Sequence, residues 1–82
     1  MHVTVISPEQ AVFDGAAESV IAPAHDGLVG ILPRHAAFMT LLGSGVLTVR
    51  SGGGENRFQV AGGFLQVAQD RVRIVADRVA KA

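Results

Sequence analysis

Few side chains in this 82-residue sequence have the types and spacings that catalysis requires. In the middle of the chain the histidines are His25, which precedes Asp26, and His35, and ten residues between the two imidazoles match no short metal-ligand spacing. Because the chain has no cysteine, it has neither a thiolate nucleophile nor a thiolate metal site. We interpret both histidines as loop residues that hydrogen-bond locally. The competing hypothesis is a hydrolase that uses His35 with Asp26, and it lacks a nucleophile.

Two glycine-containing segments match catalytic loops only in part. Gly43-Ser44-Gly45 is not a nucleophile elbow, because that motif places its glycines two residues on either side of the serine. Gly52-Gly53-Gly54 is followed by no Lys-Ser or Lys-Thr pair, and no helix opens there to bind a phosphate. We predict a turn and a flexible hairpin loop. The residues alone therefore indicate a non-catalytic module, with no active site, cofactor or metal.

Composition narrows the class of protein further. Seven basic residues balance seven acidic ones, which argues against a nucleic-acid binder. Hydrophobic residues make up 49% of the chain and charged residues 17%, so a folded domain is expected, with some apolar surface facing a partner. No run of about 18 apolar residues is present to span a membrane, and the first residues do not have the pattern of a signal peptide.

The elements that must position these residues are predicted to be strands. Valine and isoleucine dominate the apolar set, and glycine and proline cut the chain into pieces of strand length. Arg71 to Asp77 alternates polar and apolar residues as a half-buried strand does. We predict an all-β fold, a two-sheet β-sandwich or flattened barrel of about nine to ten short strands over residues 1–78. Residues 79–82 form a tail, and the stretch from Asp77 to Ala82 is the only candidate for the start of a helix.

Two of these predicted strands are apolar on both faces. Val20-Ile21-Ala22 and Phe38-Met39-Thr40-Leu41-Leu42 place no charged residue on either face. One interpretation is that the second face contacts a partner, and the other is that the domain itself covers both faces. Met and aromatic side chains are enriched in interface cores, so we expect Phe38 or Met39 at a subunit contact.

Four collinear segments resemble a known family over nearly the whole chain. They are Ser7-Pro8-Glu9 with Phe13-Asp14-Gly15, then Gly27 to Ala36 (GLVGILPRHA), then Gly62-Gly63-Phe64 with Val67, and last Val72 to Asp77. In this order they are similar to the N-terminal β-sandwich domain of the ε subunit of the F-type ATP synthase.

The resemblance implies a non-catalytic rotor subunit in the central stalk of a proton-translocating ATP synthase. Such a subunit joins the γ subunit to the membrane c-ring and transmits rotation for ATP synthesis, on the cytoplasmic face of the bacterial inner membrane. The family's contacts with γ carry over to Ser7, His35 and Thr40, beside the Phe38 and Met39 already singled out. Its contacts with the c-ring carry over to Asp26, Gly27 and Leu28.

The sequence departs from the family pattern in three places. Leu28 stands where a carboxylate is frequent, and Ala37 stands where proline usually follows His-Ala. The two-helix domain that commonly follows the sandwich is absent from this chain, which is either naturally short or truncated. We therefore expect no self-inhibition and no nucleotide binding. The alternative function is a stand-alone β-sandwich that binds a small apolar ligand in a cavity lined by Phe58, Val60, Leu65 and Val67.

Overall fold

A computed structural model describes all 82 residues, and every regular element in it is a strand. The eight strands, in chain order, are β1 (His2–Ile6), β2 (Ala11–Ala16), β3 (Ser19–Ala24), β4 (Gly27–Ile31), β5 (Phe38–Leu41), β6 (Ser44–Ser51), β7 (Gly54–Ala68) and β8 (Arg71–Lys81). The predicted all-β class is confirmed. There is no helix that could cross a membrane.

The strands are fewer and longer than the nine or ten predicted. Gly62 and Gly63 look like a break in the sequence, yet β7 continues through both with positive φ angles of 71° and 109°. An extended strand of its 15 residues would span about 50 Å, whereas the longest dimension of the molecule is 26 Å. The strand therefore bends, and glycine is the residue type that allows such backbone angles without strain.

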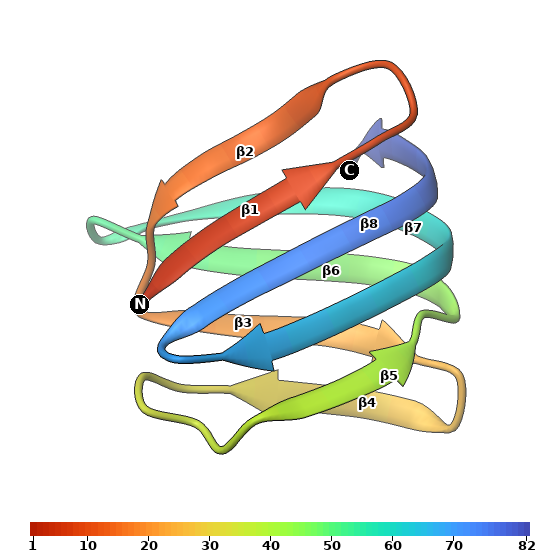
Figure 1. Cartoon of the computed structure of the whole chain (residues 1–82). Coiled ribbons are helices and arrows are strands. Elements are labelled where there is room, and N and C mark those ends of the chain that lie inside the picture. The colour runs from red at the N-terminus through yellow and green to blue at the C-terminus, as the bar shows by residue number, and fades with distance from the viewer.

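The bend in β7 allows one connected set of strands to form two layers (Figure 1). The sheet order is β2-β1-β8-β7-β6-β3-β4, and β5 pairs with β7 off this path. The first half of β7 pairs with β6, and its last four residues before Ala68 pair with β5. Strand β1 runs parallel to β8, and the other pairings are antiparallel. The result is an open β-sandwich.

Residues of both layers meet in one apolar core. Its members alternate along the strands with residues that face outward, as a sandwich requires. The buried set is Val3, Val5, Ala17, Val20, Ala22, Ile31, Leu42, Leu47, Val49, Val60, Leu65, Val67, Val72, Ile74 and Ala76.

One turn and the C-terminal tail differ from the sequence prediction. The loop predicted between the sixth and seventh strands is a two-residue turn, with Gly52 and Gly53 at φ angles of 59° and 81°. Two positive φ angles match the twist of a tight antiparallel hairpin. The candidate helix in the tail is wrong, because β8 extends to Lys81 and pairs there with Phe58 of β7. Pairing with a neighbouring strand outweighs the helix propensity of so short a segment.

Candidate subunit-contact surface

The exposed large hydrophobic side chains all lie within one contiguous part of the chain. They belong to β3, β4, β5 and the loop between β4 and β5, and none comes from β1, β2, β6, β7 or β8. In Figure 1, β4 and β5 lie together at the lower side of the sandwich. The six side chains are Ile21, Leu28, Leu32, Phe38, Met39 and Leu41. Exposed large hydrophobic side chains that are confined to a few elements mark an interaction site more often than singly scattered residues do.

Strand β5 divides its side chains between two faces. Phe38 and Thr40 pair with the buried residues Val67 and Leu65, so both lie on the core side of the sheet. Met39 and Leu41 lie on the outer side, where they are 62% and 61% exposed. The expectation that this segment is apolar on both faces is confirmed, and its outer face is open to solvent.

Leu41 begins an apolar row that crosses four strands of the outer face. It pairs with Phe64 of β7, which pairs with Val75 of β8, and Ile6 of β1 lies opposite Val75. Phe64, Val75 and Ile6 are partly exposed. Aligned side chains on one face of a sheet contact one another, so the row is continuous.

The loop that leads into β5 is fixed by a long-range hydrogen bond. The backbone N–H of Arg34 donates to Oδ1 of Asp70 across 2.9 Å, and Arg34 has a φ of 65°. This hydrogen bond, more than any other interaction, holds the pKa of Asp70 below its ordinary value. Within the loop, the ring of His35 lies 6.0 Å from that of Phe38, and its Nδ1 is hydrogen-bonded to the carbonyl of Ala36. His35 thus lies beside the first residue of β5.

The three residues predicted to contact a c-ring lie at the β3–β4 turn, with Asp26 in the turn itself and Gly27 and Leu28 as the first two residues of β4. Gly27 has a φ of 133°, which glycine adopts readily, and Leu28 is 75% exposed. The backbone N–H of His25 donates to the carbonyl of Leu41 across 3.0 Å. This turn therefore lies against the end of β5, so the two predicted contact regions adjoin.

Ser7 does not join them. It is only 7% exposed and lies in the turn between β1 and β2, where its hydroxyl donates to the carbonyl of Gln10 and accepts from the N–H of the same residue. Strands β8 and β7 separate β1 from β5. A partner contact at Ser7 stays a prediction, and the hydrogen bonds assign it a local role in the turn.

The structure supports neither alternative from the sequence. Asp26 and His35 lie beyond opposite ends of β4, and no three metal-ligating side chains come together. The proposed ligand cavity is filled, because Val60, Leu65 and Val67 are buried in the core and no groove reaches Leu65 or Val67.

Sequence reasoning missed three residues of this surface. They are Leu32 and two members of the apolar runs, Ile21 and Leu41. The sequence holds a signal for Leu32, since it directly precedes Pro33, which cannot continue the hydrogen bonding of a strand.

A small β-sandwich whose exposed large hydrophobic side chains are confined to β3, β4, β5 and the β4–β5 loop has the anatomy of an interaction domain. The family model described as "ATP synthase, Delta/Epsilon chain, beta-sandwich domain" matches residues 1–82. The chain belongs to this family, so the family predicted from the sequence is confirmed.

Individual relatives are consistent with this family assignment. The chain is 42% identical to the ATP synthase epsilon chain of Alkalilimnicola ehrlichii over 83 residues, which covers 100% of this chain and 59% of the relative. It is 45% identical to the ATP synthase epsilon chain of Prochlorococcus marinus over 73 residues, which covers 89% of this chain and 55% of the relative. It is 40% identical to the ATP synthase epsilon chain of Chloroflexus aurantiacus over 82 residues, which covers 100% of this chain and 59% of the relative. The chain thus spans less than two thirds of the length of these relatives.

Solved structures share the fold. A chain in the cryo-EM structure of the Euglena gracilis mitochondrial ATP synthase (OSCP/F1/c-ring) matches 96% of this chain with a TM-score of 0.89, and this chain covers 51% of it. A chain in the central stalk/c-ring structure of the Tetrahymena thermophila mitochondrial ATP synthase matches 99% with a TM-score of 0.81, with 66% of it covered. Both are 21% identical to this chain, so the likeness establishes the β-sandwich alone.

Proposed function

We propose that this chain is the β-sandwich part of a central-stalk subunit in the rotor of an F-type, proton-translocating ATP synthase. It joins γ to the c-ring, transmits rotation and needs no active site of its own. The observation that carries the proposal is that all six exposed large hydrophobic side chains belong to β3, β4, β5 and the β4–β5 loop. Membership of the delta/epsilon family and the names of the relatives support the choice of complex.

In this proposal γ covers β5 and the loop before it. Met39 supplies the central exposed side chain, Phe38 and Thr40 support it from the core side, and His35 borders it through its contact with Phe38. Stable interfaces bury about 1,200–2,000 Å² in total, so γ would cover more than one strand. Ser7 keeps its place in the proposed γ contact only as the end of the outer face, next to Ile6.

The c-ring contacts the β3–β4 turn, at Asp26, Gly27 and Leu28. Leu28 gives this turn an exposed apolar side chain, so the contact depends on burial of the leucine more than on charge. The subunit would then be peripheral, at the cytoplasmic face of the bacterial plasma membrane.

A coupling element must resist shear, and the bonding of β5 meets this need. Four residue pairs join β5 to β7, and the hydrogen bond from Arg34 to Asp70 anchors the loop that precedes it. The strand that contacts γ is thereby connected to the longest strand of the sandwich.

The proposal is tested by binding of the chain to isolated γ. Met39→Asp places a charge on the exposed face of β5, so the dissociation constant should rise at least about a hundredfold, as for a buried interface anchor. Gln59→Asp is the matched control, because Gln59 is exposed on the outer face of the other layer. Unchanged affinity of a folded Met39→Asp variant would reject the γ contact at β5.

A further inference from the structure

The largest groove on the molecule lies beside the β5 surface, on the outer face of β2, β1, β8 and β7. It has a volume of about 530 Å³ and is lined mostly by polar side chains. The pairing of the strands aligns Met39, Gln66, Arg73, Thr4 and Asp14 in one row across five strands. Arg71 and His2 lie opposite each other two residues away. The groove therefore begins next to Met39 and extends toward β2.

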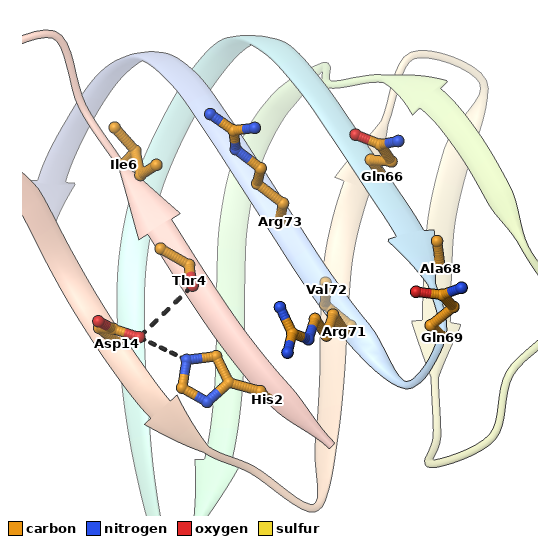
Figure 2. Close-up of a pocket in the computed structure, with 10 residues that line it drawn as sticks. All are labelled: His2, Thr4, Ile6, Asp14, Gln66, Ala68, Gln69, Arg71, Val72 and Arg73. Carbon is orange, nitrogen blue, oxygen red and sulfur yellow. Dashed lines mark hydrogen bonds and ion pairs between the residues drawn. The ribbon is translucent and has the colours of Figure 1, made fainter.

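The groove carries positive charge that the chain does not neutralise. Arg71 and Arg73 project from neighbouring positions on one face of β8, and neither guanidinium is in a salt bridge. The one carboxylate in the groove is that of Asp14, and it is occupied by hydrogen bonds from its neighbours. Figure 2 shows it joined to the His2 imidazole, 2.5 Å away, and to the Thr4 hydroxyl, 3.5 Å away.

The remaining donors match the oxygens of a carboxylate. Guanidinium groups form paired hydrogen bonds with carboxylates, and residues two apart on a strand lie about 6.5 Å from each other. The amide of Gln66 lies opposite Arg73 and adds a further donor between the guanidiniums and β5. A partner that covers Met39 and continues along the same row would meet Gln66 and Arg73 next.

We propose that this groove binds acidic side chains of the γ subunit, as the charged continuation of the apolar contact at β5. The inference rests on the proposed function, since it takes γ as the partner. Two arguments select γ: the groove continues the row that starts at Met39, and its unpaired guanidiniums call for a partner of opposite charge. The apolar part provides burial, and the charged part orients γ during association.

The test is binding of isolated γ to the double variant Arg71→Glu with Arg73→Glu. The dissociation constant should rise at least about tenfold at low ionic strength, because two carboxylates now face the acidic side chains. The deficit should shrink at high salt, because the screening length falls from about 10 Å at 0.1 M to about 3 Å at 1 M.

A matched control separates the groove from net charge. Arg57→Glu with Arg78→Glu changes the charge of the chain equally on the other layer of the sandwich, and it should change the affinity by less than about twofold. Equal weakening by both pairs, or native affinity for the groove variant, would overturn the inference. If the double glutamate variant does not fold, the double variant Arg71→Gln with Arg73→Gln is measured in its place. Native affinity of that variant for γ would also overturn the inference.

Results with Met39→Asp distinguish this inference from the proposed function. If Met39→Asp abolishes binding and the groove variant binds normally, γ contacts β5 and the groove has no part in it. If Met39→Asp binds normally, the contact at β5 itself is wrong.

Discussion

The carboxylate of Asp70 accepts a hydrogen bond from the backbone N–H of Arg34, 36 residues away in sequence. Asp70 lies in the turn between β7 and β8, and Arg34 lies in the loop between β4 and β5. Both residues have positive φ angles, 61° for Asp70 and 65° for Arg34. One side chain thus joins the loop that precedes β5 to the turn between β7 and β8.

This relationship predicts a pH dependence. The folded chain lowers the pKa of Asp70 below its ordinary value of 3.8, chiefly through the hydrogen bond from Arg34. A lowered pKa in the folded state means that the ionised carboxylate stabilises the fold above its unfolded pKa, and that this contribution is lost as the pH falls through the folded pKa. The melting temperature of the native chain should therefore fall more steeply below about pH 4 than that of Asp70→Asn.

Thermal melts from pH 7 down to pH 2 measure the difference. Asp26→Asn is the matched control, because Asp26 is an exposed carboxylate whose side chain has no hydrogen-bond partner in the chain. Identical pH profiles for the native chain and Asp70→Asn would show that the hydrogen bond does not stabilise the loop.

The bend in β7 predicts that Gly63 cannot be replaced without loss of stability. A Cβ at residue 63 would collide with the carbonyl oxygen of Val75, and its φ of 109° disfavours any other residue. Gly63→Ala should lower the free energy of unfolding by at least about 2 kcal/mol, as backbone strain and steric overlap add.

Urea unfolding of Gly63→Ala beside Gly30→Ala checks this prediction. No heavy atom lies within 4 Å of a Cβ at Gly30, whose φ is not positive, so that variant should stay within about 0.5 kcal/mol of the native chain. A similar small effect at both positions would mean that β7 does not need its bend at Gly63.

A third prediction concerns core packing behind β5. Leu65 is fully buried and pairs with Thr40 of β5 and Ile74 of β8. Leu65→Ala should cost about 2–5 kcal/mol of unfolding free energy, because it leaves a cavity between the layers. Leu41→Ala, at an exposed site in β5, should cost less than about 0.5 kcal/mol. Equilibrium unfolding distinguishes the two, and comparable losses would contradict the assignment of Leu41 to the outer face.

The turn between β3 and β4 gives a fourth prediction. Leu28 is 75% exposed, so Leu28→Asp should leave the stability within about 0.5 kcal/mol of native while weakening attachment to the c-ring. Co-sedimentation with membranes that contain the c-ring and γ measures that attachment. Normal co-sedimentation of the variant would remove this turn from the proposed interface.

Local patterns predicted the strands but not their partners. The alternation from Arg71 to Asp77 gave β8, since period-two burial is a property of neighbouring residues. The parallel pairing of β1 with β8 joins opposite ends of the chain, and no local signal specifies it. For the same reason the sequence suggested a helix near Lys81, where a neighbouring strand decides the outcome.

The candidate contact surface was likewise predicted in part from the sequence and determined in part by the fold. The order of residues already indicated that the segment from Phe38 to Leu42 is apolar on both faces, which is the basis of the proposed γ contact. Which face is open depends on the register of β5 with β7, which places Phe38 and Thr40 opposite the buried Val67 and Leu65, and that is a tertiary fact. The hydrogen bond between Arg34 and Asp70 could not be predicted from the sequence, because many exposed carboxylates could pair with many backbone N–H groups.

The most direct test of the account uses the absence of cysteine in the chain, which makes an introduced thiol unique. Met39→Cys and Gln59→Cys are each labelled with a short photoreactive cross-linker in the assembled ATP synthase, and the products are identified by mass spectrometry. We expect a γ cross-link from residue 39 and none from residue 59. Cross-linking to γ from residue 59 alone, or from neither position, would contradict the claim that γ is held at β5.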